Sequence, residues 1–234
     1  MNKTGTEQKD SAAQKGIHRK AWKWASAHRK LSLIILVVLA AAIGIGIWLF
    51  ARSDESTKEI SNNPIIASYQ KQLPALADAV KKDGNDPKAR QEYAVALYAT
   101  GDVGQAKEQY EAQLKLASND ATLRNNLGNV YRDLGDYEKA IDSYQKSIDI
   151  NKKQTNAYIN LANLYLYTLD KKDLAVQVYR DALRNNPDNQ DLMVLLGIAY
   201  EQSGDKNKAR DTFRDVLDKN ASNAAAQAGL KRVQ

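Results

Sequence analysis

The sequence predicts an all-α protein in which a single N-terminal transmembrane helix precedes a solenoid of about four helical hairpins and a C-terminal capping helix. Two observations support this prediction. Gly101 and Ala106 return 34 residues later as Gly135 and Ala140, and the same step relates many other small, aromatic and turn residues. A fixed period of this length is typical of an array of identical helical hairpins. Residues 31–50 form a run of twenty residues without a charge, which is typical of a membrane span.

The first two elements are a basic tail over residues 1–30 and an apolar anchor over residues 31–50. The anchor is long enough, as a helix, to cross a hydrocarbon core of about 30 Å. A removable signal peptide usually has a shorter apolar stretch, and cleavage near residues 40–42 is the alternative that the sequence leaves open. The tail carries eight Lys or Arg and two acidic residues. The positive-inside rule therefore predicts a single-pass protein of the cell membrane, with its N-terminus cytoplasmic and the chain after residue 50 extracytoplasmic.

The excess positive charge of the chain is confined to this tail, because the residues after the anchor contain equal numbers of acidic and basic side chains. Anionic lipids at the inner membrane surface are the partner that best explains such a tail. We expect no nucleic acid partner, although a cytoplasmic nucleic acid or protein ligand of the tail is the alternative. His18 and His28 lie in the tail without cysteines or clustered carboxylates nearby. No metal site is therefore expected there.

Two elements connect the anchor to the repeats. Residues 51–64 are polar and rich in serine, asparagine and charge, which is typical of a flexible stalk. A helix is expected within residues 65–86, because apolar residues recur at helical spacing along it. Pro74 lies inside this stripe and predicts a kink. The helix either caps the first repeat or binds a partner, and the sequence leaves both alternatives open. The stripe consists of Ile65, Ile66, Tyr69, Leu73, Leu76, Ala77 and Val80.

Four repeat units follow, each predicted to contain two helices joined by a tight turn. The units span residues 87–120, 121–154, 155–189 and 190–223, and a last helix over residues 224–234 is expected to cover the final apolar face. The turn is Gly-Asp in three units, since Gly tolerates a left-handed backbone and Asp caps the next helix. The third unit lacks the glycine and slips by one residue, a change that we place within residues 168–172. Two columns of small residues predict close helix crossings: Ala94, Gly128, Ala162 and Gly197, then Ala106, Ala140, Ala175 and Ala209.

These columns resemble the tetratricopeptide repeat (TPR) family, whose units are helical hairpins of this period with small, aromatic and Gly-Asp-Tyr-like residues in this order. The best copy is residues 121–154, which contain Leu127-Gly128, Tyr131, Gly135-Asp136-Tyr137, Ala140 and Tyr144. The usual tryptophan of the first helix is absent, and Arg90, Arg124, Tyr158 and Met193 stand in its place. The resemblance implies a scaffold that organises other proteins, as similar membrane-anchored bacterial repeat proteins do in envelope assembly or secretion.

The resemblance also implies a binding site, because in this family the first helix of each unit lines a concave groove that takes extended or helical peptide segments. We place a peptide-binding groove on ten residues of the second to fourth units. Asparagine amides offer donors and acceptors suited to a peptide backbone, and we expect those outside the column of Asn126 and Asn160 to stand on an exposed face. The ten residues are Asn125, Asn129, Arg132, Asn156, Asn160, Asn163, Tyr167, Val194, Leu195 and Ile198.

Two alternatives qualify this groove. Asparagine in the column of Asn126 and Asn160 is common in the family and bonds within the hairpin. The family's groove for terminal carboxylates pairs asparagines with basic residues, but Asp191 and Leu195 occupy the matching places of the fourth unit. We therefore expect no recognition of a chain terminus. Val194, Leu195 and Ile198 are instead expected to form an apolar patch beside the amides.

The sequence contains no pattern typical of an enzyme. It has no cysteine, and its two histidines both lie in the tail, so that the repeats lack thiol nucleophiles and the commonest general base. No Gly-rich phosphate loop and no HExxH pair occurs. We expect no catalytic, cofactor-binding or metal site and no cofactor. The alternative to an interaction scaffold is a self-associating structural membrane protein that forms homo-oligomers, in which Ala40 and Gly44, or Ala42 and Gly46, pair the anchors.

Overall fold

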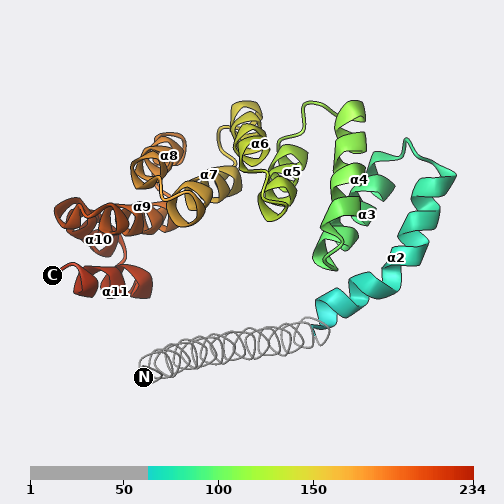
Figure 1. Cartoon of the computed structure of the whole chain (residues 1–234). Coiled ribbons are helices and arrows are strands. Elements are labelled where there is room, and N and C mark those ends of the chain that lie inside the picture. The colour runs from blue at the N-terminus through green and yellow to red at the C-terminus, as the bar shows by residue number, and fades with distance from the viewer. Residues whose placement is uncertain (1–62) are drawn as a thin grey trace, which may run out of the picture. The chain divides into compact units, whose positions relative to one another are not determined.

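Helices follow one another throughout the part of the chain that the computed structural model describes, which is residues 63–234, and no strand occurs there (Figure 1). The all-α repeat fold predicted from the sequence is confirmed for these residues. The predicted tail (1–30), the anchor (31–50) and nearly all of the stalk (51–64) lie outside them. None of the helices within residues 63–234 is both long and apolar enough to cross a membrane.

A long helix, four hairpins and a closing helix succeed one another along residues 64–234 (Figure 1). In each hairpin we call the two members the first and the second helix. The long helix is α2 (Pro64–Lys82). The hairpins are α3 (Pro87–Ala99) with α4 (Val103–Leu116), α5 (Ala121–Asp133) with α6 (Tyr137–Ile150), α7 (Thr155–Asn163) with α8 (Lys172–Asn185), and α9 (Gln190–Ser203) with α10 (Lys206–Lys219); the closing helix is α11 (Ala224–Arg232).

The turns inside the hairpins follow from their Gly-Asp pairs. Gly101, Gly135 and Gly204 have φ values of 90°, 80° and 88°, a left-handed backbone that side chains with a Cβ rarely adopt. The aspartate after each glycine caps the second helix, as Asp136 does by accepting a hydrogen bond from the backbone N–H of Lys139. The repeated dipeptide therefore ends one helix and begins the next.

The third hairpin absorbs one extra residue in a π-helical turn, η1 (Leu164–Thr168), directly after α7. The backbone N–H of Leu169 donates to the carbonyl of Leu164 at 3.0 Å, a bond that spans five residues instead of four. The insertion is thus taken up mainly before the segment 168–172 in which the sequence placed it. Asp170, with φ 51°, adopts the left-handed backbone that glycine supplies in the other hairpins.

The core depends on an aromatic ring from each second helix that lies against the backbone of the first helix. A Cβ added to Gly128 would lie 2.5 Å from Cε1 of Tyr144, and one added to Gly197 would lie 2.6 Å from Cε1 of Phe213. Both rings are fully buried. The column of small residues exists because nothing larger fits between ring and backbone. Neighbouring hairpins share their buried clusters, so that the core runs along the row of hairpins.

The two ends of the array differ. α11 covers the last apolar face with Ala226 and Val233, which are both fully buried. Lys231 is exposed and stands 34 residues after Gly197, in the column of small residues. A second helix that followed α11 would need a small residue there for its aromatic ring to pack on α11. At the other end α2 packs Leu73 against the first core cluster, yet none of its residues is buried. Pro74 lies inside α2, and Figure 1 shows the helix bending along its length.

Candidate functional site

The ten residues that the sequence assigned to a peptide-binding groove all lie on first helices or on η1, but their exposure differs widely. Asn156 and Tyr167 are exposed, whereas Asn125 and Val194 are only 6 % exposed. The expectation that the asparagines outside the column of Asn126 and Asn160 stand on an exposed face is therefore wrong for Asn125. The remaining six are partly buried: Asn129, Arg132, Asn160, Asn163, Leu195 and Ile198.

Two asparagines at equivalent places of consecutive hairpins are fixed by tyrosine hydroxyls. The hydroxyl of Tyr144 donates to Oδ1 of Asn129, and that of Tyr179 donates to Oδ1 of Asn163, both at 2.8 Å. The sequence predicted that the asparagine column containing Asn160 would form the bonds within the hairpin. That prediction is wrong for Asn160, because Asn129 and Asn163 form these bonds. Neither amide nitrogen of the two bonded asparagines has a hydrogen-bond partner among the described residues, and neither is buried. Each amide therefore keeps N–H donors that no described residue binds.

The pKa values of the two tyrosines agree with this donor role. Burial raises the pKa of Tyr144 and that of Tyr179 well above the ordinary value. Both hydroxyls therefore keep their protons near neutral pH, and each continues to donate to its asparagine. The orientation of the two amides is stable across the physiological pH range.

Asn125 and Asn160 join two neighbouring hairpins. Nδ2 of Asn160 on α7 donates to Oδ1 of Asn125 on α5 at 2.9 Å. This bond occupies the acceptor of one amide and a donor of the other. Asn125 is therefore structural, and Asn160 keeps one N–H for other partners.

Arg132 belongs to a charged cluster that is neutral overall. Nε of Arg132 donates to Oδ1 of Asp133 at 2.8 Å, and the hydroxyl of Tyr98 donates to the other carboxylate oxygen. Burial, helped by Asp133, raises the pKa of Tyr98 to about 12. Burial alone would raise the pKa of Asp133, but the hydrogen bonds from Arg132 and Tyr98 lower it below its ordinary value. The cluster therefore adds no net charge to this face.

The same pairing holds at both ends of the face. Lys88 and Glu92 on α3 form an ion pair of 3.9 Å, and Glu201 on α9 pairs with Arg232 on α11 at 2.8 Å. These pairs compensate part of the charge on the first helices, while Arg90, Arg124 and Asp191 have no ion pair among the described residues. This arrangement favours a neutral ligand over a charged chain terminus, as the sequence also indicated.

The predicted apolar patch in the fourth hairpin is smaller than expected. Val194 belongs to the buried cluster around Phe213, and Ile198 packs partly against the same cluster. Leu195 packs against the neighbouring cluster of the third hairpin. Only the outer parts of Leu195 and Ile198 remain accessible, so Val194 is not a contact for a ligand.

Sequence reasoning missed the tyrosines that orient the asparagines, although the sequence contains a signal for them. The second-helix aromatic is tyrosine where the first helix has Asn129 or Asn163 to accept its hydroxyl. In the fourth hairpin the corresponding pair is Ile198 and Phe213, and no hydroxyl is present. In the first hairpin, however, Tyr110 is tyrosine although Val95 occupies the place of the asparagine, so the aromatic residue does not change strictly together with this neighbour and the signal is weak.

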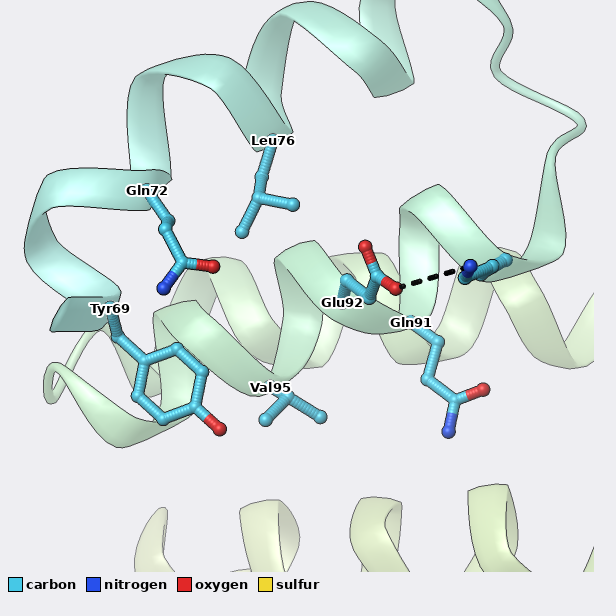
Figure 2. A pocket seen from close by; sticks show the side chains of 7 residues that line it. Tyr69, Gln72, Leu76, Gln91, Glu92 and Val95 are labelled. Atoms are coloured by element: carbon cyan, nitrogen blue, oxygen red, sulfur yellow. Dashed lines mark ion pairs between the residues drawn. The ribbon is translucent and has the colours of Figure 1, made fainter. Parts of the chain in front are cut away.

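A pocket of about 310 Å³ lies at the N-terminal end of this face, between α2 and α3. Figure 2 shows Tyr69, Gln72 and Leu76 pointing from α2 toward α3. The other lining residues come from α3 and are Lys88, Gln91, Glu92 and Val95.

Comparison with known proteins agrees with this architecture. Residues 111–226 match the family model described as the cytochrome c-type biogenesis protein H TPR domain. The chain is a tetratricopeptide repeat protein. No curated protein sequence matches the TPR chain.

Solved structures share the fold of the TPR array. A crystal structure of MamA is 22 % identical and has a TM-score of 0.60, covering 68 % of this chain and 92 % of that one. YrrB, described as a TPR protein with an unusual peptide-binding site, is 21 % identical with a TM-score of 0.53, covering 68 % and 81 %. MamA from Desulfovibrio magneticus RS-1 is 18 % identical with a TM-score of 0.53, covering 63 % and 82 %. At these identities the likeness concerns the fold.

Proposed function

We propose that this TPR protein is a non-catalytic, membrane-anchored scaffold that binds an extended segment of a partner protein on the face of its first helices. The observation that carries the proposal is the pair of amides on Asn129 and Asn163, one repeat apart, each held by a tyrosine hydroxyl and each with N–H donors that no described residue binds. YrrB, which shares the fold, is described as having a peptide-binding site, and the matching family model is named for a biogenesis process. The first supports the binding of a peptide segment, and the second supports a role in assembly at the cell envelope or in secretion.

The chemistry of the face suits an extended backbone. An extended peptide presents carbonyl acceptors all along its length, so donors repeated along a solenoid can bond it at successive places without reading its side chains. The compensated charges nearby do not select acidic or basic residues. Tyr167, which is 65 % exposed, adds an aromatic surface next to Asn163 on the same hairpin. Extended segments of varied sequence fit this description.

Replacing Asn129 and Asn163 together by Asp should weaken peptide binding about tenfold to a hundredfold, since each lost hydrogen bond contributes about 0.5–1.5 kcal/mol. Aspartate keeps the acceptor that each tyrosine hydroxyl needs and removes both N–H donors. The fold is therefore retained while the proposed contact is lost. The measurement is the affinity of peptides that the wild-type protein selects from a displayed library of unstructured sequences.

The control is Asn207→Asp on α10, which makes the same Asn-to-Asp exchange at one position outside the first helices. Its Oδ1 accepts from Arg210 at 3.1 Å, and aspartate preserves that bond. The control should bind the selected peptides with wild-type affinity. Equal binding by the Asn129 and Asn163 variant, or failure of the wild-type protein to select any peptide, would contradict the proposed face.

The proposal places the anchor at residues 31–50, with the basic tail on anionic lipids in the cytoplasm and the TPR array on the other side of the membrane. In cells stripped of their outer barriers, added protease should then degrade the repeats and leave the tail intact, as detected with antibodies against each part. Reversing the charges of Arg19, Lys20, Lys23, Arg29 and Lys30 should invert a fraction of the molecules. Repeats that stay protected until the membrane is dissolved would refute this topology.

A further inference from the structure

α2 occupies the position of a second helix whose first helix is absent from the described residues. Its connection to α3 ends at Asp86, which caps α3 by accepting hydrogen bonds from two backbone N–H groups, as Asp120 caps α5. Leu76 stands one period before Tyr110, and Gln72 one period before Ala106. Tyr110 is 2 % exposed and Ala106 fully buried. In α2 the corresponding positions instead line the open pocket.

The side of α2 that borders the pocket has the pattern of a helix-pairing seam. Ile65, Tyr69, Gln72, Leu76 and Ala79 are spaced by four, three, four and three residues, the spacing by which helices pair side by side. Ile65 is 65 % exposed. The helix has 19 residues, whereas each second helix of the four hairpins has 14. α2 thus presents a longer apolar seam than the packing on α3 requires.

We propose that α2 of a second copy of this chain packs over the pocket, with the two α2 helices antiparallel about a two-fold axis at Gln72. Within every hairpin of the array the two helices run antiparallel, so the missing first helix would also run antiparallel to α2. The seam complements itself in this arrangement, because Ile65 faces Ala79 of the other copy and Tyr69 faces Leu76. Such a self-complementary contact is what a two-fold dimer requires.

Gln72 suits the axis itself. Its Nε2 already donates to the carbonyl and the hydroxyl of Ser68, at 3.1 and 2.9 Å, and its Oε1 has no partner among the described residues. Two glutamines that meet at the axis can bond each other as donor and acceptor once one N–H of each leaves Ser68. A single polar residue in an apolar seam also fixes the register of the helix pair.

The two ends of the array restrict how copies can associate. Lys231 places a long charged side chain where a helix following α11 would need a small residue, so a second copy cannot extend the row at the C-terminal end. The accessible seam lies only at the N-terminal end of residues 64–234. Association through one end of each copy produces a closed dimer and no filament.

Cysteine crosslinking tests the axis directly, because the natural chain has no cysteine. In the full-length protein purified in detergent, Gln72→Cys should crosslink with a short bis-maleimide at least about tenfold more than Ala67→Cys, since juxtaposed thiols have a high effective concentration. Ala67 is exposed and lies on the opposite side of α2. Equal crosslinking of the two variants, or none for Gln72→Cys, would overturn the proposal.

Mass measurement provides a second test that does not depend on crosslinking. Leu76→Glu should convert a dimer of the full-length protein into a monomer at micromolar concentration, while Ala67→Glu, which adds the same charge to the same helix, should leave it dimeric. Circular dichroism checks that both variants keep their helices. A wild-type protein that is monomeric, or a Leu76→Glu variant that remains dimeric, would refute the pairing of α2. If the wild-type protein is monomeric and binds helical peptides in the pocket, the pocket belongs to a different partner.

Discussion

Replacement of Gly128 by Ala should lower the free energy of unfolding by about 1–3 kcal/mol, although alanine is the better helix former. The new Cβ would lie 2.5 Å from Cε1 of Tyr144, a ring that is fully buried and tied by its hydroxyl to Asn129. Neither ring nor backbone can move without disturbing the next hairpin. Urea unfolding followed by circular dichroism measures the loss, and the transition should also broaden because stability is shared between neighbouring repeats.

The matched control is the same substitution at Gly104, near the start of α4. No atom lies within 4 Å of a Cβ built there, so Gly104→Ala should stabilise the protein by about 0.5–1 kcal/mol through helix propensity alone. Opposite signs for the two glycines would establish that the close crossing of α5 and α6 sets the cost. A Gly128→Ala variant that is as stable as the wild type would contradict the packing of Tyr144 described here.

The sequence predicts the repeat architecture because the features that define it are local and recur. Gly101, Gly135 and Gly204 mark the turns, and the small columns mark the crossings, so one hairpin explains the others. The π-helical turn at 164–168 escaped prediction because an extra residue in a helix can be absorbed at any of several turns. Which turn opens depends on the packing of Leu164 and Tyr165, which are both buried.

The candidate site was predictable only in its location. Spacing along a helix shows which residues share a face, and the family resemblance placed the ten residues on first helices, where all of them lie except Tyr167 on η1. Hydrogen bonds between helices decide which of these are accessible, and single-helix spacing does not report them. Asn125 bonds to Asn160 on the next hairpin, and Asn129 bonds to Tyr144 across its own. The sequence gives only a weak sign of these contacts, because Phe213 stands beside Ile198 but Tyr110 stands beside Val95.

Replacement of Phe213 by Ala should cost about 3–5 kcal/mol, the largest effect that we expect from a single side chain. The ring is fully buried and lies against both Gly197 on α9 and Gly229 on α11, where an added Cβ would collide with it. Its removal leaves a cavity at the junction of the last hairpin with α11. Hydrogen exchange should show α10 and α11 opening first, with the second hairpin protected as in the wild type.

Phe213→Tyr keeps the volume of the ring and tests what a hydroxyl costs when no asparagine accepts its hydrogen bond. The added hydroxyl is buried opposite Ile198, where Asn129 and Asn163 accept the corresponding hydroxyls, and an unsatisfied buried hydroxyl costs about 1–3 kcal/mol. Adding Ile198→Asn to Phe213→Tyr restores the pair found in the second and third hairpins. The double variant should therefore lose less free energy of unfolding than the sum of the losses of the two single variants. In a double-mutant cycle the difference, which is the coupling energy, should be about 0.5–3 kcal/mol. Additive losses would show that the tyrosine hydroxyls do not depend on the asparagines, and the amide orientation on which peptide binding rests would lose its support.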